Sequence, residues 1–207
     1  MVYLGNVLSA DGKFGSEISR RVGAARSEFD KLCRVWKHFS ITVKRKVAIS
    51  EACVMSKLLY HLHSICLNQA EKQKVDAFQA RSLRRILKFM ISFCSRVTNH
   101  SVLMQAQWKT SSMLLLERQM TWMGNLATRS SDDVLRQSVF QSNIAAFRPK
   151  APQGLRKRGR PKTSWASCVF QHAVQAAGGE QALQTLWQDA PRAKVEWTRC
   201  VKTYCHG

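Results

Sequence analysis

The residues of this chain best suited to chemistry are cations spaced to share one face of a helix. Over positions 69 to 90 the apolar residues recur every three or four positions, which is typical of an amphipathic helix. At about 100° per residue, five cations project onto a different face: Lys74, Arg81, Arg84, Arg85 and Lys88. Uncompensated cations repel one another, so this basic stripe predicts contact with the phosphates of a polyanion. A solvated helix face is the alternative.

A weaker group of cations opens the preceding predicted helix, at Lys44, Arg45 and Lys46. The first turn of a helix favours anions, because the backbone N–H groups there are partly positive. Cations at this place oppose the local dipole, which again indicates an anionic partner without proving one.

The sharpest local motif lies in a basic segment and reads Lys157-Arg158-Gly159-Arg160-Pro161-Lys162. It resembles the core of an AT-hook, an extended Arg-Gly-Arg-Pro segment that lies in the narrow minor groove of A·T-rich DNA. In that motif the glycine allows close approach of the backbone, and the arginines enter a zone of negative potential. Minor-groove reading, non-specific phosphate contact and a merely solvated linker all remain open.

Patterns for metal or nucleophilic chemistry are weak. No two of the seven cysteines have the close spacing of a zinc knuckle, and the nearest approach is Cys200, Cys205 and His206 with His172 upstream. We therefore expect no metal site and buried thiols instead. The Ser, His and Cys residues are scattered, which predicts no catalytic residues. The single Asp pair, Asp132-Asp133, follows two serines, where negative charge suits the start of a helix.

The composition favours an anionic partner. The chain has 207 residues, 45% of them hydrophobic, which is enough for one or two domains with cores. Against 13 Asp and Glu stand 33 Lys and Arg, a formal charge of +20, so nucleic acid is the leading partner and an anionic membrane surface the next. No apolar run approaches the roughly 18 to 20 residues of a membrane span, and no secretory signal opens the chain. We expect an intracellular, nuclear protein that does not cross a membrane.

The elements that position these residues are almost all helical, so the expected fold class is all-α. One short β-strand is expected over residues 2 to 8, before a turn at 9 to 12. Helices are expected over 16 to 36, from 42 to 62 and over 69 to 90, then over 101 to 107, 112 to 128 and 132 to 141. Periodicity stops in a linker with seven cations and no acid. The expected parts are a strand remnant at 1–12, a helical bundle at 13–141, a basic linker at 142–162 and a small C-terminal helical unit at 163–207.

Several short motifs, taken in order, resemble the region downstream of the catalytic palm in reverse transcriptases of LINE-type (non-LTR) retrotransposons. Each is weak alone, but their order and spacing are fairly specific and span almost the whole chain. Two positions depart from the family pattern: His61 stands where Gly is common, and Asn125 where His is common. The matching motifs are Tyr3-Leu4-Gly5, Glu17 to Ala25, Leu58-Leu59-Tyr60, Leu83-Arg84-Arg85-Ile86-Leu87, Arg96-Val97-Thr98-Asn99, Trp122-Met123-Gly124, and Arg158-Gly159-Arg160-Pro161 with Trp165.

This resemblance implies a thumb-like helical bundle that holds a template and primer duplex by its backbone. It also implies that the fingers and the catalytic palm, with its aspartates, lie outside this sequence, so the chain itself is expected not to polymerise nucleotides. The full-length parent would need magnesium, whereas no cofactor is expected in this chain.

The leading hypothesis is a non-catalytic reverse transcriptase fragment that binds RNA or DNA, as duplex or hybrid, without sequence preference. The alternatives are an architectural DNA-binding protein using the AT-hook-like segment, or a helical protein-interaction module. A decayed element without a selected role is also open. The sequence does not specify RNA or DNA preference, oligomeric state, or whether Met1 is the natural start.

Overall fold

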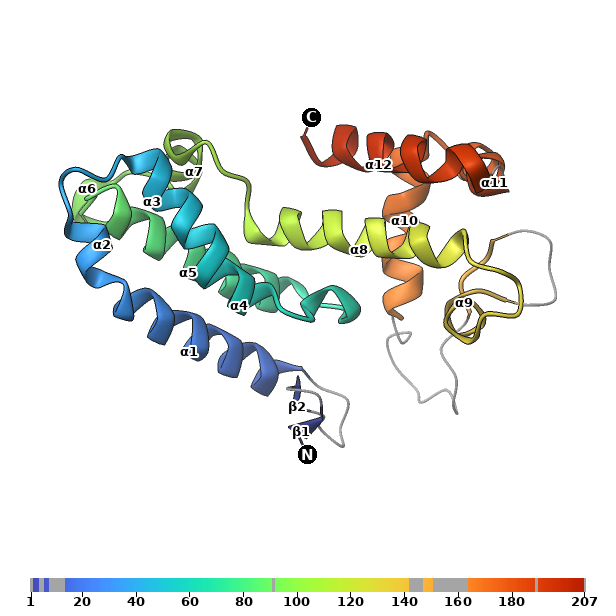
Figure 1. The fold of residues 1–207 in the computed structure, drawn as a ribbon, viewed down its shortest axis with the longest axis horizontal. Coiled ribbons are helices and arrows are strands. Elements are labelled where there is room, and N and C mark those ends of the chain that lie inside the picture. The colour runs from blue at the N-terminus through green and yellow to red at the C-terminus, as the bar shows by residue number, and fades with distance from the viewer. Residues whose placement is uncertain are drawn as a thin grey trace. The chain divides into compact units, whose positions relative to one another are not determined.

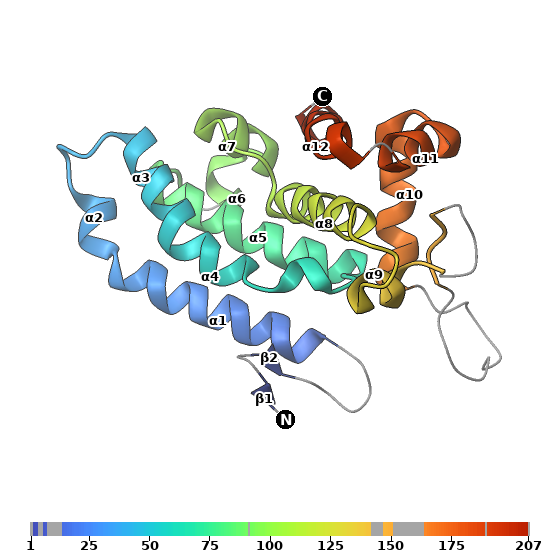
Figure 2. The same ribbon diagram turned by 45° about the vertical axis from the view of Figure 1, so that its right-hand side comes forward.

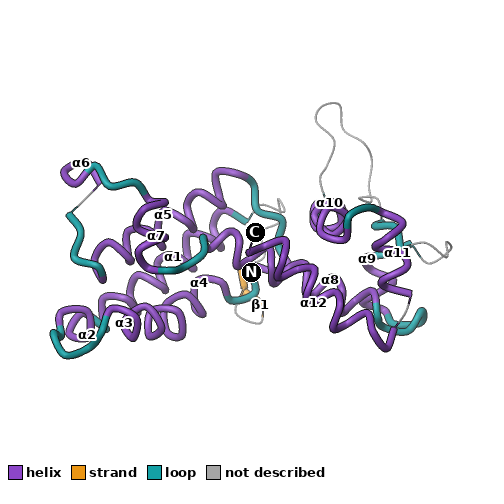
Figure 3. Tube along the Cα trace, turned by 90° about the horizontal axis from the view of Figure 1, so that it is seen from above, coloured by secondary structure: helices purple, strands orange, loops and turns teal. Residues whose placement is uncertain are grey.

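A computed structural model describes residues Val2–Tyr3, Asn6–Val7, 14–90, 92–141, 147–150, 164–188 and 190–206. Helices make up most of this described part, which confirms the all-α class (Figures 1 and 3). The chain divides into an N-terminal unit, Met1–Leu114, and a C-terminal unit, Leu115–Gly207. Each unit has a core of its own.

The chain opens with a small hairpin. Strands β1 (Val2–Tyr3) and β2 (Asn6–Val7) pair antiparallel, with Val2 opposite Val7 and Tyr3 opposite Asn6. The sequence predicted one continuous strand here. The difference is that the described residues form two short strands that pair with each other, rather than one.

Helix α1 (Gly15–Lys31) and the short α2 (Cys33–Lys37) correspond to the first predicted helix. The α1 side chains buried in the core, Ile18, Ala25 and Phe29, have helical spacing. Trp36 of α2 folds back, so that its ring stacks on Phe29 with a centroid distance of 5.0 Å. Its Nε1 donates to the carbonyl oxygen of Phe29 at 2.7 Å, so the buried indole is both packed and hydrogen-bonded.

The second predicted helix is present, but it consists of three consecutive segments: α3 (Val43–Ile49), the π-helix η1 (Ser50–Met55) and α4 (Ser56–Leu59). The Thr42 hydroxyl caps it by accepting from the N–H of Arg45. This rod contacts α1 along η1 and α4, as Figure 2 shows. After it the backbone turns at His61, which has a left-handed φ of 60°, into the 3-10 helix η2 (Leu62–Ser64).

Helix α5 (Gln69–Ile86) is the central helix of the N-terminal unit and contacts α1, α2, α3 and α7. It begins with a capping box, in which Glu71 N–H donates to the Asn68 side chain and Asn68 N–H donates to the Glu71 carboxylate. It ends four residues earlier than predicted. Lys88 adopts a left-handed φ of 59°, and the N–H of Phe89 donates to the carbonyl of Arg84 at 2.9 Å, which is the Schellman ending of a helix.

Two short helices, α6 (Ser92–Ser95) and α7 (Asn99–Ala106), complete this unit, and α7 packs on α5. The α5 side chain of Gln79 then ties down the chain that follows. Its Nε2 donates to the carbonyl of Lys109, and its Oε1 accepts from the N–H of Ser111, both at 2.7 Å. Ser111 is the first residue of α8 (Ser111–Ala127), inside which the two units divide.

The C-terminal unit holds α9 (Val134–Val139), α10 (Trp165–Ala177), α11 (Glu180–Gln188) and α12 (Ala190–His206). Its core is aromatic. Trp187 is 2% exposed and meets Phe140, Phe147 and Trp197 edge-on, with centroid distances of 5.3 to 5.8 Å.

The division between the units falls earlier than the predicted linker at 142–162. The physical reason is that aromatic contacts join α8 to the C-terminal helices. Trp122 packs edge-on against Trp165 of α10 at 4.8 Å, and Trp197 Nε1 of α12 donates to the carbonyl of Met120 at 2.9 Å. Helices α8 and α9 therefore share a core with the tail, rather than with the predicted bundle.

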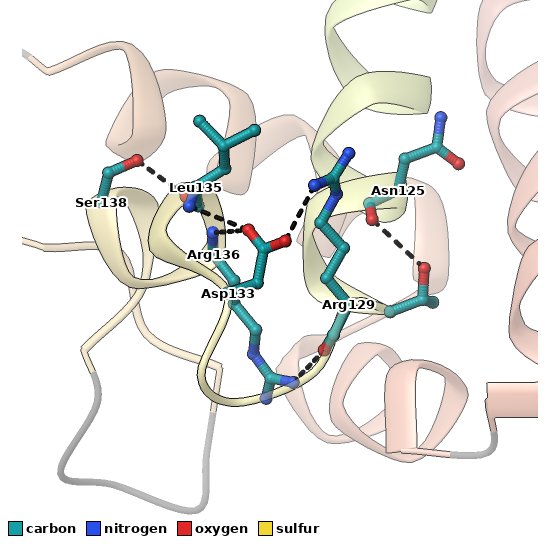
Figure 4. A network of polar contacts seen from close by, with 7 residues as sticks. Asn125, Arg129, Asp133, Leu135, Arg136 and Ser138 are labelled. Carbon is teal, nitrogen blue, oxygen red and sulfur yellow. Dashed lines mark hydrogen bonds and ion pairs between the residues drawn. The ribbon is translucent and has the colours of Figure 1, made fainter.

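The Asp pair lies where its interpretation as helix-start charge places it (Figure 4). Asp133 is the N-cap of α9, and its Oδ1 accepts from the N–H groups of Leu135 and Arg136 at 2.8 and 3.1 Å. Its Oδ2 accepts from Arg129 Nη1 at 2.8 Å. The hydrogen bond from Arg129, followed by that from the Arg136 backbone, lowers the pKa of Asp133 below its ordinary value.

Candidate nucleic-acid interface

Positive charge dominates the N-terminal unit. Residues 1 to 114 contain 19 Lys and Arg against 7 Asp and Glu. Both acidic residues of α5 accept hydrogen bonds from backbone N–H groups. Glu71 accepts from Asn68 in the capping box, and Asp76 accepts from Ser112 at 2.8 Å. Neither carboxylate is turned toward the cations of this helix.

Three of the five predicted cations do share an exposed face of α5. Lys74, Arg81 and Arg85 are all exposed and fall within about 40° of one another around the helix axis. The first and the last of them are eleven positions apart, or about 16 Å along the helix. Because the remaining circumference of α5 is mostly buried, these side chains line its only broad exposed strip among the described residues. We call Lys74, Arg81 and Arg85 the α5 strip.

The strip lies beside α1, whose side chains hold two of its cations in place. Lys74 Nζ donates to the hydroxyl of Ser19 at 2.8 Å, and Arg85 Nη1 pairs with Asp30 Oδ1 at 2.8 Å. Arg85 and Asp30 are 57% and 51% exposed, so water screens this ion pair and it adds little stability. Arg81 bonds within the helix, from Nε to the carbonyl of Ala77.

Arg84 differs from its expected role as a surface cation. Only 6% of it is exposed, and its guanidinium points to the segment before α7. Nη2 donates to the carbonyl of Val97 at 2.6 Å and to Asn99 Oδ1 at 3.1 Å, while Nη1 lies 3.5 Å from Ser95 Oγ. These acceptors, rather than phosphates, satisfy the charge, so Arg84 is a structural residue.

Lys88 also departs from the predicted stripe, since α5 ends at Ile86 and Lys88 lies beyond it. Its side chain is exposed, so it stays available to an anion, but its direction is set by the left-handed turn and not by helical periodicity.

The weaker group at the start of α3 is split in a similar way. Lys44 and Arg45 are exposed, as an anion-binding role requires. Lys46 is 4% exposed and its Nζ donates to the carbonyl of Trp36 at 2.9 Å, so the expectation that it contacts phosphate is wrong. The AT-hook-like residues Lys157, Arg158, Gly159, Arg160, Pro161 and Lys162 lie outside the described residues.

A pocket of about 280 Å³ adjoins one end of the α5 strip. Sequence reasoning missed it, because it combines side chains from α2 with the residues that follow α5, and no local pattern links these segments. Three cations and four apolar or sulfur-containing residues line this Trp36 pocket: Lys37, Arg85, Lys88, Cys33, Trp36, Phe89 and Met90.

The described part of the chain can also be compared with the sequence-based candidates for metal ligation and for a membrane span. No group of three or more His, Cys, Asp or Glu side chains there could hold a metal ion. His172, one of the candidate ligands, instead has its Nδ1 3.1 Å from the hydroxyl of Tyr204. No described helix is both long and apolar enough to cross a membrane. No family model, curated protein or solved structure matches this chain.

Proposed function

We propose that the chain binds duplex or hybrid nucleic acid through backbone phosphates, without sequence preference, as a non-catalytic part of a LINE-type reverse transcriptase. The observation that carries this proposal is the α5 strip, which presents Lys74, Arg81 and Arg85 along one exposed arc of a capped and largely buried helix. Exposed Lys44 and Arg45 on α3 add to the positive field of the same unit.

The packing of α5, which carries the strip, suits contact with the regularly spaced phosphates of a nucleic acid. Because α5 packs on four other helices, the backbone positions that carry its cations are held at fixed spacing, and binding needs to order only the side chains. Phosphate contacts position a nucleic acid but carry no base information, so cations on a rigid helix favour binding that tolerates any sequence.

The retrotransposon assignment is supported by contacts between the motifs that suggested it. Arg84 of Leu83-Arg84-Arg85-Ile86-Leu87 donates to Val97 and Asn99 of Arg96-Val97-Thr98-Asn99. Trp122 of Trp122-Met123-Gly124 packs on Trp165, four residues after Pro161 of the Arg-Gly-Arg-Pro motif. These contacts join separate motifs of the proposed family pattern, and we take them as support for reading the motifs together. A thumb-like role for the N-terminal helices is part of the same proposal.

Fluorescence anisotropy with a labelled blunt duplex over a series of salt concentrations tests the binding. Each phosphate contact releases about one counterion, so we expect the logarithm of affinity to fall against that of salt with a slope of about −3 to −5. The variant Lys74→Gln/Arg81→Gln/Lys44→Gln should flatten the slope by about 2 to 3.

A matched control removes the same charge from α12, in Lys194→Gln/Arg199→Gln/Lys202→Gln, and should leave the slope near its wild-type value. Salt-independent binding by the wild type would exclude phosphate contact altogether. If the α12 variant flattens the slope and Lys74→Gln/Arg81→Gln/Lys44→Gln does not, the interface has been placed on the wrong unit.

The AT-hook-like motif supports a second candidate, an architectural DNA-binding protein. It predicts tighter binding to A·T-rich than to G·C-rich duplex, and loss of that preference in Arg158→Ala/Arg160→Ala. Equal affinity for the two duplexes in the wild type would remove this candidate.

A further inference from the structure

We infer that the Trp36 pocket, at the end of the α5 strip, receives one unpaired nucleotide of the bound strand. This inference rests on the proposed function and names a partner more closely: a duplex that ends in a single-stranded overhang. The pocket brings together two features that a nucleotide requires, an apolar wall for the base and cations for its phosphate.

The wall has a fixed, buried aromatic residue at its base, and the surface open to a ligand belongs to the residues beside it. Trp36 is 4% exposed, stacks on Phe29 and has its Nε1 hydrogen bond satisfied by the Phe29 carbonyl, so it does not need to reorganise when a ligand arrives. Phe89 and Met90 extend this surface, and Met90 is 66% exposed. An exposed thioether beside aromatic rings is well suited to an aromatic base, because sulfur is polarizable and adapts to a flat partner.

The rim of the pocket carries positive charge. Lys37, Arg85 and Lys88 are all exposed. Arg85 is oriented by the Asp30 carboxylate and by the Phe29 ring, over which its guanidinium carbon lies at 4.8 Å. Among the described residues Asp30 is paired with Arg85, and we expect the exposed Lys37 and Lys88 to receive the phosphate. An apolar ligand would not need such a rim, and a free phosphate would not need the wall.

The left-handed backbone at Lys88 closes α5 and sets the direction in which the lysine side chain leaves the helix end. Its φ of 59° lies in the left-handed region, where glycine is the favoured residue at the end of a helix. A lysine there costs conformational energy that a glycine would not. The turn has its own role in ending the helix, so the variant Lys88→Gly separates this backbone cost from the contribution of the ammonium group to binding.

The size of the pocket limits what it can hold. At about 280 Å³ it lies at the lower end of the roughly 300–1,000 Å³ typical of ligand pockets. A single base fits this scale, whereas a base pair does not. We therefore expect an unpaired nucleotide to enter the pocket in preference to the stacked base pair at the end of a blunt duplex.

Anisotropy titrations with one blunt duplex, and with the same duplex carrying a three-nucleotide overhang, test the inference on the full chain. We expect the overhang to bind about tenfold more tightly, the scale of one base contact. Lys37→Gln and Met90→Ala, both at exposed positions, should each remove most of that difference while blunt-duplex binding stays within about twofold. Equal affinity for the two duplexes in the wild type overturns the inference.

Cys33 lines the pocket and reports its occupancy directly. Alkylation followed by peptide mass spectrometry should show that the overhang duplex slows modification of Cys33 several-fold more than the blunt duplex does. Modification of the exposed Cys94 provides the control and should be unchanged. Tighter overhang binding without protection of Cys33 would place the nucleotide elsewhere and overturn the assignment of the pocket.

A pair of glycine substitutions separates strain from binding. Lys88→Gly should raise the melting temperature and reduce the overhang preference. Gln107→Gly relieves a similar left-handed φ of 51° at the end of α7, and Gln107 is not among the pocket residues, so it should raise the melting temperature alone. An unchanged overhang preference in Lys88→Gly would contradict the role of Lys88. Salt-dependent binding of the blunt duplex without an overhang effect rejects this inference and leaves the proposed function standing, whereas absence of salt-dependent binding rejects both.

Discussion

The indole ring of Trp197 lies directly against Gly124, in the space that a Cβ atom at position 124 would occupy. Such a Cβ would overlap Cδ1 and Nε1 of the ring. The same Nε1 donates to the carbonyl of Met120, one turn earlier on α8, at 2.9 Å. A glycine at this point therefore lets α12 dock an aromatic side chain on the backbone of α8, within the core of the C-terminal unit.

Gly124→Ala should consequently destabilise the protein. The added methyl group must push the indole away and weaken its hydrogen bond to Met120, a cost of about 1–3 kcal/mol in the free energy of unfolding. Urea denaturation measures this change. Gly23→Ala is the matched control, since Gly23 lies within α1 with no atom near its would-be Cβ, and it should stabilise by about 0.5–1 kcal/mol. A neutral Gly124→Ala would show that Trp197 packs elsewhere.

His61→Gly should stabilise the N-terminal unit. His61 has a φ of 60°, which costs a residue with a side chain roughly 1–2 kcal/mol, whereas glycine adopts it freely. Glycine also has a larger backbone entropy in the unfolded chain, which offsets part of this gain. We therefore expect the free energy of unfolding, measured by urea denaturation, to rise by about 0.5–1 kcal/mol. His63→Gly serves as the comparison, because His63 lies in η2 without a positive φ and its replacement should not stabilise. If His63→Gly proved more stable than His61→Gly, the backbone strain assigned to His61 would be refuted.

Arg84→Gln should lower the free energy of unfolding, whereas Arg81→Gln should reduce the salt dependence of duplex binding. Removing the guanidinium of Arg84 leaves the Val97 carbonyl and the Asn99 amide oxygen without their donor and should cost about 2–3 kcal/mol of unfolding free energy. Arg81→Gln changes an exposed residue, so stability should stay within about 0.5 kcal/mol while the salt slope for duplex binding falls by about 1. Denaturation and anisotropy on both variants check this; equal stabilities would contradict the buried role of Arg84.

The pairing of Asp133 with Arg129 should contribute stability at neutral pH and lose it in acid. The pKa of Asp133 is lowered from its ordinary 3.8, so the ionised form is favoured in the folded state. This contribution is complete above that ordinary value and disappears as pH falls through the lowered pKa. Asp133→Asn keeps an oxygen to cap α9 but loses the charge, so the wild type should be more stable at pH 7, and the advantage should vanish in this acidic window.

Denaturation of both proteins between pH 7 and about pH 2 measures the difference, and an NMR titration of the Asp133 carboxyl locates its pKa. High salt should also reduce the advantage at neutral pH, because Arg129 is exposed and Asp133 is partly so. A wild-type advantage that grows as the pH falls would contradict the ion pair.

Local chemistry alone decided most of the helices. The Asn68 and Glu71 capping box, the Asp133 N-cap and the spacing of Ile18, Ala25 and Phe29 act over one or two turns, so they can be read from neighbouring residues. The excess of cations, and the position of Glu71 and Asp76 outside the arc of Lys74, Arg81 and Arg85 on the same helix, were likewise visible in the sequence.

Only the tertiary structure decided which cations face solvent. Arg84 and Arg85 are neighbours separated by about 100° around the helix, so burial of one and exposure of the other depend on where residues 95 to 99 pack. Lys46 is removed from the surface by the Trp36 carbonyl, and the Trp36 pocket exists because α2 meets the end of α5. Periodicity specifies angles about one helix axis, whereas burial depends on contacts between segments that are distant in the chain.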